Sequence, residues 1–344
     1  MIKIKTILSA ITSVTLLTGM GATAPVFADT LDDVKKRGFL RCGTGEAKAG
    51  FAMPGDNNQW QGMEIDYCKA LSSAVFGDET KFEVVPVTSK VRFTSLTSRE
   101  IDVLVKGTTW TYSRDAKLGV DFAAYWFFDG QGFLIKKELG VTSAKQLNGA
   151  TICISPGTTS EKNVADYFRT YDMKYKPVVI KAGPETLDAL QKGRCDVITN
   201  DLSALASDRQ KFTNPDDFVV LQDNIAKEPL SLYVRQNDSR WKDVITWTRN
   251  ALVEAEELGI TQENVGQHAK HPIDPRIARL LGSKGAYGEM LGLPNTWAHD
   301  AISAVGNYGE IFERNVGEQT RMGLTRNLNQ QWYDGGLVFA PPFR

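Results

Sequence analysis

The chain has 344 residues with 40 Lys and Arg against 41 Asp and Glu, which gives a net charge of −1. This balance excludes the clustered basic composition of a nucleic-acid-binding protein. No stretch after the N-terminal segment is long and apolar enough to span a bilayer, so a multi-span membrane protein is excluded as well.

The N-terminus has the order of a secretory signal peptide. Lys3 and Lys5 precede an apolar run from Ile7 to Met20, and small residues lead to Ala28. The alternative, a single membrane anchor, requires about 20 apolar residues, which this run does not reach. We therefore expect residues 1–28 to be removed and the mature protein to be periplasmic. The remaining length predicts two lobes, at roughly 100–200 residues per domain.

The first elements of the mature chain alternate between helix and strand. Residues 31–38 are expected to form a short helix that ends at Gly38, and residues 39–43 a strand that enters a Gly-rich loop. Residues 63–76 have helical spacing of apolar side chains, and residues 82–87 form the next strand. Strand, helix and strand in this order predict a parallel sheet with helices on its faces.

All four cysteines lie in the mature chain, at Cys42, Cys68, Cys153 and Cys195. Three pairings are open, and the order along the chain favours Cys42 with Cys68 and Cys153 with Cys195, one bridge in each lobe. An oxidising compartment favours such bridges. A metal site is not expected, because no Cys-x-x-Cys occurs and all three His lie after residue 267.

An internal repeat indicates that both lobes contain the same α/β unit. In each copy a helix end leads through a polar turn into a short apolar strand, at residues 101–104 and 195–198. An Asp opens each strand, and the chain reaches Gly107 or Asp201 five residues later. Chance similarity between two such units is the alternative. Because ligands bind at the carboxyl ends of strands in open α/β sheets, we expect Gly107 and Asp201 at the site.

Two segments, residues 125–133 and 227–234, are interpreted as crossings between the lobes. The first lobe is then expected to comprise residues 29–130 and 231–344, and the second lobe residues 131–230. A two-strand hinge suits closure around a ligand.

The segment 106–114 combines a Gly that lets backbone approach a ligand, several hydroxyl groups, and Arg114 on the following helix. A guanidinium holds a carboxylate through two parallel hydrogen bonds, so Arg114 is the candidate for that contact. The alternative is a solvated helix residue. Asp201 supplies the opposite charge, suited to an ammonium group, and could also cap the helix that follows it.

Residues 155–161 follow a strand at 150–154 and begin a helix. Thr158 and Glu161 fit a capping box, so Glu161 is expected to be structural. The free amides at this helix start suit an anionic group, which Thr158 and Thr159 could bind directly. No nucleophile elbow or dinucleotide motif occurs, and no His precedes residue 268, so no catalytic site is expected.

Several ordered motifs resemble those of the polar amino-acid periplasmic binding proteins of ABC importers. The matching segments are residues 62–66, 96–102, 107–114, 120–122, 157–159 and 195–201. The whole mature chain, including residues 305–315 and 335–342, resembles the general L-amino-acid subgroup. The resemblance implies an α/β type II periplasmic binding protein, with two lobes joined by a two-strand hinge and the ligand in the interlobe cleft. It also implies an L-amino-acid ligand, an inner-membrane ABC permease as partner, a monomer, and no cofactor.

The resemblance divides the expected site between the two charged groups of an amino acid. Arg114 and the amide region at 158–159 are implied to bind the α-carboxylate. Asp201, the Gly107 carbonyl and the Thr109 hydroxyl are implied to hold the α-ammonium. The expected ligand-binding residues are Ser89, Gly107, Thr109, Arg114, Ser155, Thr158, Thr159 and Asp201.

Two departures from the family pattern favour a broad ligand range. The loop at 43–51 lacks the usual acidic and aromatic pair, and Ser89 and Lys90 stand where relatives often have an aromatic lid. The alternative function is a periplasmic enzyme on the same fold that resembles cyclohexadienyl dehydratase. Such an enzyme needs a positioned acid, and Glu161 is the only nearby candidate. A ligand-sensing receptor domain is a third hypothesis, disfavoured because no transmembrane segment or signalling domain is attached.

Overall fold

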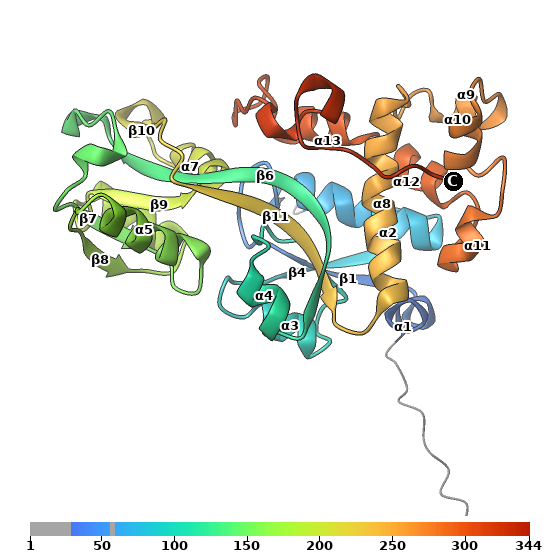
Figure 1. Ribbon diagram of the computed structural model, residues 1–344, viewed down its shortest axis with the longest axis horizontal. Coiled ribbons are helices and arrows are strands. Elements are labelled where there is room, and N and C mark those ends of the chain that lie inside the picture. The colour runs from blue at the N-terminus through green and yellow to red at the C-terminus, as the bar shows by residue number, and fades with distance from the viewer. Residues whose placement is uncertain (1–28, 56–58) are drawn as a thin grey trace, which may run out of the picture.

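The protein folds around one mixed β-sheet that runs through two α/β halves (Figure 1). The computed structural model describes residues 29–55 and 59–344, so the predicted signal peptide lies outside the described residues. Across the sheet the strands follow the order β4, β1, β5, β11, β6, β9, β7 and β8, and β10 pairs with β6. The strands are β1 Leu40–Thr44, β4 Phe82–Pro86, β5 Val103–Leu104, β6 Val120–Lys136, β7 Thr151–Ile154, β8 Lys176–Val179, β9 Val197–Asp201, β10 Phe218–Val220 and β11 Ala226–Arg235, with a separate hairpin of β2 Met53–Pro54 and β3 Trp60–Gln61.

Each half contains three parallel strands with helices packed against them. In the first half β1 pairs with β4 and β5, and in the second half β7 pairs with β8 and β9. Most predicted boundaries shift by one or two residues, and the first helix ends at Gly38, whose φ of 83° suits glycine. The helices up to the second hinge strand are α1 Thr30–Arg37, α2 Met63–Phe76, α3 Arg92–Thr97, α4 Tyr112–Lys117, α5 Thr159–Thr170, α6 Pro184–Gln191 and α7 Leu202–Arg209.

Strands β6 and β11 connect the halves as an antiparallel pair. They pair from Val120 with Arg235 to Gln131 with Ala226, and β6 then continues against β9 over residues 131–135. Both segments predicted as crossings lie inside or at the ends of this pair. The predicted lobe boundaries at 130/131 and 230/231 also fall within these two strands and stay a prediction.

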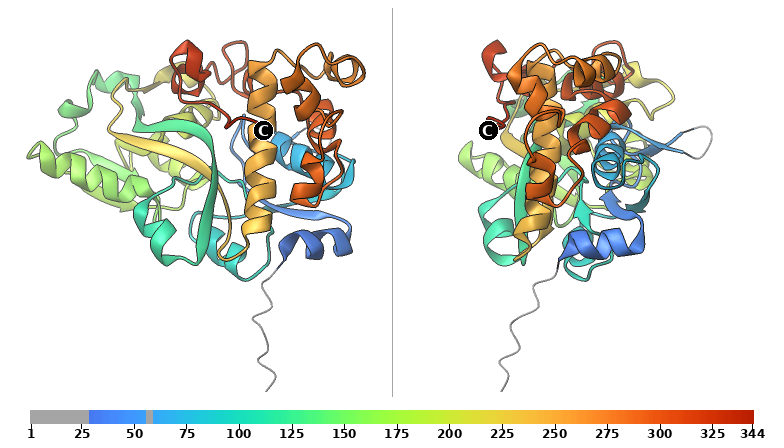
Figure 2. Two further views of the ribbon diagram at one scale, coloured as in Figure 1. Left: turned by 45° about the vertical axis from the view of Figure 1, so that its right-hand side comes forward. Right: turned by 90° about the vertical axis from the view of Figure 1, so that its right-hand side faces the viewer.

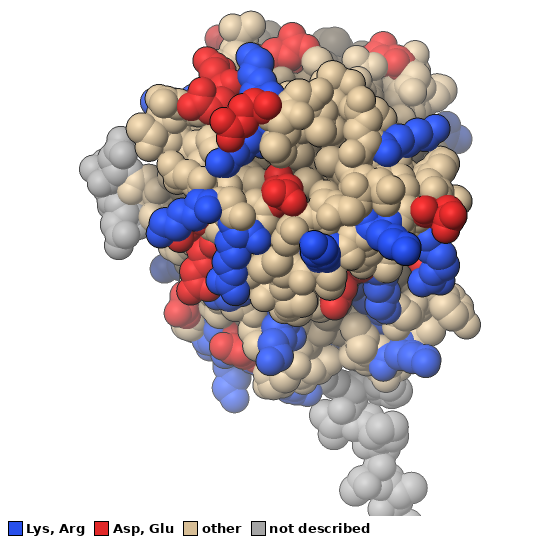
Figure 3. Space-filling model, turned by 90° about the vertical axis from the view of Figure 1, so that its left-hand side faces the viewer, with Lys and Arg blue, Asp and Glu red and all other residues tan. Residues whose placement is uncertain are grey.

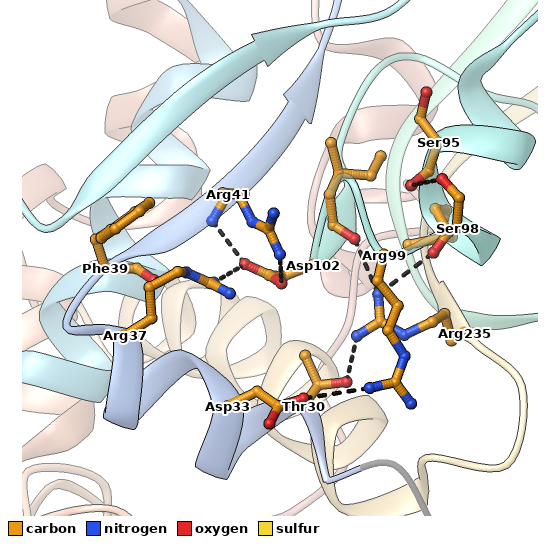
Figure 4. Close-up of polar contacts among 12 residues, drawn as sticks. Thr30, Asp33, Arg37, Phe39, Arg41, Ser95, Ser98, Arg99, Asp102 and Arg235 are labelled. Atoms are coloured by element: carbon orange, nitrogen blue, oxygen red, sulfur yellow. Dashed lines mark hydrogen bonds and ion pairs between the residues drawn. The ribbon is translucent and has the colours of Figure 1, made fainter.

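The internal repeat has the same hydrogen bond in each half. Asp102 accepts from the Arg41 amide at 2.7 Å beside β1, and Asp196 accepts from the Thr151 amide at 2.8 Å beside β7. Each Asp therefore satisfies an amide at the start of the neighbouring parallel strand. Arg37 also contacts Asp102 in the first half (Figure 4). This shared contact explains why an Asp precedes both β5 and β9.

Both predicted disulfides are present. Cys42 in β1 bonds Cys68 in α2, and Cys153 in β7 bonds Cys195 just before β9, with sequence separations of 26 and 42 residues. On the loop-entropy model, closures of these lengths stabilise each half by at most about 3.5–4 kcal/mol. Among residues 29–55 and 59–344, no group of three or more His, Cys, Asp or Glu side chains forms a metal-binding cluster.

The residues after β11, whose role could not be assigned from sequence, pack on the first half (Figure 2). The helices α2, α8 and α12 contact one another there, and buried Trp241, Tyr308 and Phe312 belong to the same core as β1 and α2. This part of the chain thus enlarges the first half. Its helices are α8 Ser239–Glu257, α9 Val265–Lys270, α10 Pro275–Leu280, α11 Tyr287–Leu291, α12 Trp297–Val305 and α13 Tyr308–Asn315. Short 3-10 turns lie at Lys137–Leu139, Ala144–Gln146, Pro215–Asp217, Asn327–Asn329 and Trp332–Asp334.

The C-terminal segment also holds the hinge strand β6. Buried Asn329 accepts from the Phe128 amide at 2.7 Å and donates to the Phe128 carbonyl at 2.9 Å. Tyr308 donates to the Trp126 carbonyl at 3.0 Å. The side-chain amide of Asn329 therefore takes the place of a neighbouring strand at this point of β6.

Replacing Asn329 with Ala is expected to lower the free energy of unfolding by about 1–2 kcal/mol, because two backbone groups of Phe128 lose their partner. Urea unfolding followed by circular dichroism measures this change. Asn214→Ala is the matched control, since Asn214 is exposed and should change stability by less than about 0.5 kcal/mol. Equal effects of the two substitutions would contradict a hinge-holding role for Asn329.

Within the described part of the chain, no helix combines the length and apolar character that a membrane span requires. The face at the outer end of the second half carries basic side chains interspersed with acidic ones (Figure 3). This distribution agrees with the balanced charge of the sequence.

Candidate functional site

A cavity of 490 Å³ lies between the two halves. Its walls come from the segments that follow β1, β4 and β5 in the first half and β7, β8 and β9 in the second. The cavity thus lies at the carboxyl ends of both sets of parallel strands, which is where a ligand is expected in such sheets.

The halves touch each other across this cavity. The loop after β1 meets α7, where Lys48 Nζ donates to Ser203 Oγ at 2.9 Å and the Ala49 amide donates to Ser207 Oγ at 2.8 Å. Lys181 and Glu46 form an ion pair at 3.1 Å over the same gap. The structure is therefore in a closed arrangement.

All eight predicted ligand-binding residues line this one cavity, although they come from both halves and four separate segments. They are Ser89, Gly107, Thr109 and Arg114 from the first half and Ser155, Thr158, Thr159 and Asp201 from the second.

Arg114 is only 8% exposed, so it is not a solvated helix residue. One terminal nitrogen of its guanidinium donates to the Thr109 carbonyl at 2.7 Å, and the guanidinium lies 5.5 Å from the centre of the Phe93 ring. Burial lowers the pKa of Arg114, which the nearby Tyr233 and acidic side chains partly offset. Among the described residues its other nitrogens have no acceptor, so they remain available to an anion in the cavity.

Asp201 ends β9 and stands at the N-cap position of α7, but its side chain makes no capping hydrogen bond. The alternative reading of Asp201 as the cap is therefore wrong. Asp129 on the hinge strand performs this task, because its carboxylate accepts from the Ser203 amide at 3.3 Å. Burial raises the pKa of Asp201, and the cations Lys48 and Arg92 oppose that shift.

The backbone around Gly107 is fixed from both sides. Glu64, 1% exposed, accepts from the Gly107 amide at 2.9 Å and from the Gly45 amide at 2.7 Å. The Thr109 carbonyl accepts from Arg114 and, at 2.9 Å, from the Tyr233 hydroxyl. A Cβ at position 107 would lie 3.3 Å from a methyl group of Leu230, so a larger residue would crowd the cavity floor.

The predicted capping box at the start of α5 forms only in part. Thr158 accepts from the Glu161 amide at 3.3 Å and donates to the Ser155 carbonyl at 2.7 Å. Glu161 accepts from the Gly157 amide at 3.2 Å, and the reciprocal contact to Thr158 is not made. Glu161 is thus engaged with backbone, and the hydroxyl hydrogen of Thr158 is already donated within the protein.

Ser89 and Lys90 line the cavity near Gly157, where relatives were expected to have an aromatic lid. In the part of the chain that the structure describes, no aromatic side chain lines the cavity. Trp110 belongs to the segment 106–114, which was predicted to contribute to the site, but it stacks on Phe122 with ring centres 4.2 Å apart. These lining residues therefore include no aromatic lid, and Trp110 is a packing residue.

Sequence reasoning missed most of the charges in the cavity. Buried Arg92 begins α3 and half-buried Lys106 begins the segment 106–114, and neither was predicted as a site residue. Loss of solvation lowers their pKa values to about 9 and about 8. For Lys106 the available signal was a cation directly after the apolar run 103–105. The basic lining residues are Lys48, Lys90, Arg92, Lys106, Arg114, Lys181 and Lys211, and the acidic ones are Glu46, Glu64, Asp201 and Asp208.

Glu228 on the hinge strand β11 was also missed as a site residue. It is fully buried, and its carboxylate accepts from the hydroxyls of Thr109 and Thr159 and from the Asn163 amide. Burial, reinforced by Asp201, raises the pKa of Glu228 to about 7. Its position before Pro229 in a largely apolar strand was the only sequence signal.

Two α/β halves that close over a polar cavity, joined by a pair of long strands, define a type II solute-binding protein. The chain belongs to the bacterial extracellular solute-binding proteins, family 3, whose model matches residues 40–264. The predicted fold class and family are therefore confirmed.

The chain is similar to several binding proteins, and the similarity extends over nearly the full length of each. The glutamate/glutamine/aspartate/asparagine-binding protein of Rhodobacter capsulatus is 50% identical over 317 residues, which cover 92% of this chain and 94% of that protein. The general L-amino acid-binding periplasmic protein of Rhizobium johnstonii is 48% identical over 344 residues, covering 99% of this chain and 100% of that protein. A periplasmic binding protein structure from Brucella ovis with glutathione bound has 50% identity and a TM-score of 0.90, and the match covers 92% of this chain and 100% of that one.

These relatives confirm the prediction of a binding protein that is not an enzyme. The dehydratase hypothesis is correspondingly disfavoured.

Proposed function

We propose that the chain captures L-amino acids in the periplasm, as a monomer, and delivers them to an ABC permease complex in the inner membrane. The observation that carries this proposal is a pair of opposite charges on one cavity, buried Arg114 from one half and half-buried Asp201 from the other. Every L-amino acid presents an α-carboxylate and an α-ammonium group at a fixed separation. A clamp on these two groups needs no particular side chain.

On the carboxylate side, Arg114 and the amides at the start of α5 bind the ligand. The hydroxyl hydrogens of Thr158 and Thr159 are donated to Ser155 and Glu228, so the backbone amides are the donors left at this helix start. Such amides, together with the helix dipole, favour an anion. Ser155 and Ser89 border this side of the cavity.

On the ammonium side, Asp201 supplies the counter-charge, with the Gly107 carbonyl and Thr109 hydroxyl as further acceptors. An ammonium group has three donors and no acceptor, which three oxygen atoms can satisfy. The periplasmic site of action rests on the relatives' names and on the predicted signal peptide at residues 1–28.

A second ligand class is favoured by the size and charge of the cavity. Its 490 Å³ falls within the range of about 300–1,000 Å³ that pockets for ligands larger than a small amino acid have. Glutathione, the ligand of the Brucella ovis structure, carries a free α-carboxylate and α-ammonium on its glutamyl end. The same clamp would therefore hold it, and the surplus of basic lining residues would suit its second carboxylate.

Isothermal titration calorimetry of the mature, ligand-stripped protein tests this function. L-glutamate, L-glutamine and L-alanine are expected to bind with micromolar or lower Kd, and glutathione is expected to compete with them. Carboxylic acids that lack the α-amino group are expected to bind far more weakly. Absence of micromolar binding by any L-amino acid, together with turnover of prephenate-like acids, would contradict the proposal.

A further inference from the structure

Glu228 lies where the hinge and both halves meet. One carboxylate oxygen accepts from Thr109 Oγ1 of the first half and, at 3.0 Å, from Thr159 Oγ1 of the second. The other oxygen accepts from the Asn163 side-chain amide at 2.7 Å. The two threonine oxygens lie 3.4 Å apart, so this arrangement requires the closed protein.

The charge state of Glu228 decides which way the threonine hydroxyls point. An ionised carboxylate only accepts hydrogen bonds, so Thr109 and Thr159 must both donate to it. The Thr109 oxygen then presents only lone pairs to the cavity. Lone pairs attract an ammonium group and repel a carboxylate.

We propose that Glu228 is a positioning residue that fixes the Thr109 hydroxyl as an acceptor for the α-ammonium of the ligand. Because the same carboxylate oxygen also binds Thr159 of the other half, this orientation of Thr109 is linked to closure of the two halves. Glu228 acts through Thr109 and does not itself touch the ligand. The inference rests on the proposed amino-acid function of the cavity. It adds a hinge residue that helps to determine which end of the ligand faces which half.

The charges around Glu228 come from four elements, while α5 contacts it through the uncharged Thr159 and Asn163. Two acidic neighbours are Asp201 at the end of β9 and Asp129, the residue of β6 that pairs with Glu228. Two basic neighbours are Arg114 of α4 and Arg92 of α3. Burial and Asp201 favour the protonated form, while the threonine hydroxyls and Arg114 favour the ionised form. These opposing effects leave the pKa of Glu228 at about 7.

This balance makes ligand binding depend on pH. A protonated Glu228 donates a hydrogen bond, which frees a threonine hydrogen to face the ammonium group. The ligand therefore binds the ionised form and lowers the pKa of Glu228 in the complex. Binding then releases a proton near neutral pH, and affinity rises with pH until Glu228 is fully ionised.

Calorimetric titration of L-glutamine against the wild-type protein and the Glu228→Gln variant tests the proposal. The wild-type Kd is expected to fall by up to about tenfold between about pH 6 and pH 8, the limit for one group of pKa about 7. The variant carries a donor at this position, so it is expected to bind about tenfold more weakly at pH 8 and to lack this part of the pH dependence. Parallel pH profiles of the two proteins would overturn the proposal.

Two features of the design isolate Glu228. Asp129 and Lys106, with pKa values of about 6 and about 8, remain in both proteins, so only the difference between the profiles is assigned to Glu228. Glu254→Gln is the matched control, since Glu254 is also a buried carboxyl of raised pKa but borders a different cavity beside the C-terminus. This control is expected to keep the wild-type Kd at both pH values.

A double-mutant cycle tests whether Glu228 acts through Thr109. Glu228→Gln is expected to have no further effect on Kd in a Thr109→Val background, and independent effects that multiply would overturn the proposal. If Glu228→Gln does not fold, proton release is measured for wild type and Thr109→Val in buffers of different ionisation enthalpy. Equal release would then overturn it. Failure of wild type to bind any L-amino acid would instead contradict the proposed function itself.

Discussion

Replacing Arg114 with Ala is expected to weaken every L-amino acid by a similar factor, about 10- to 150-fold. Hydrogen bonds to charged groups contribute about 1.5–3 kcal/mol, which corresponds to this range. The factor is shared because the proposed partner of Arg114 is the α-carboxylate, which all these ligands have in common. Arg114→Lys keeps the charge but loses the planar fork, so an intermediate loss is expected. Calorimetry with L-alanine, L-glutamine and L-glutamate measures the three factors.

The control for Arg114 is Arg99→Ala. Arg99 is 53% exposed and pairs with Asp33 on the surface of the first half, away from the cavity. Its removal is expected to leave all three Kd values unchanged. A loss confined to one type of ligand side chain in Arg114→Ala would show that Arg114 is not the α-carboxylate anchor.

Replacing Asp201 with Asn is expected to weaken L-alanine by about 10- to 100-fold, through loss of a charge-assisted hydrogen bond to the ammonium group. Lactate, in which a hydroxyl replaces that group, is expected to lose little or nothing. The ratio of the two Kd values in wild type and variant, measured by calorimetry or competition, reports the contact directly.

Asp166→Asn serves as the control for Asp201, because Asp166 is an exposed carboxylate of α5 that pairs with Arg169 on the surface. It is expected to leave the ratio of the alanine and lactate Kd values unchanged. If Asp201→Asn weakened both ligands equally, Asp201 would act on closure or stability instead of on the ammonium group.

Local pattern was sufficient to predict the repeated α/β unit and both disulfides. Asp102 and Asp196 each stand at the start of a strand, five residues before Gly107 and Asp201. In the structure each of these Asp side chains accepts a hydrogen bond from an amide of the neighbouring parallel strand. The site followed from this repeat, since the ends of equivalent strands must face one another once two such units close. Gly107 and Asp201 line the cavity for that reason.

The parts of the site that sequence could not give depend on contacts between distant segments. Asp129, and not Asp201, caps α7. The two segments are far apart in sequence, and Asp129 reaches the start of α7 because strand β6 passes beside that helix. Glu228 meets Thr109 and Thr159 from opposite halves, at separations that no local motif records. The role of the C-terminal helices could not be predicted because they bury their apolar faces against one another and against α2, which is distant in sequence.

A crystal structure of the mature protein soaked or grown with an L-amino acid tests the central claim most directly. The α-carboxylate is expected within hydrogen-bond distance of the Arg114 guanidinium and the amides at the start of α5. The α-ammonium is expected on Asp201, the Gly107 carbonyl and Thr109. A ligand bound in the reverse orientation, or outside the cavity between the halves, would contradict the account.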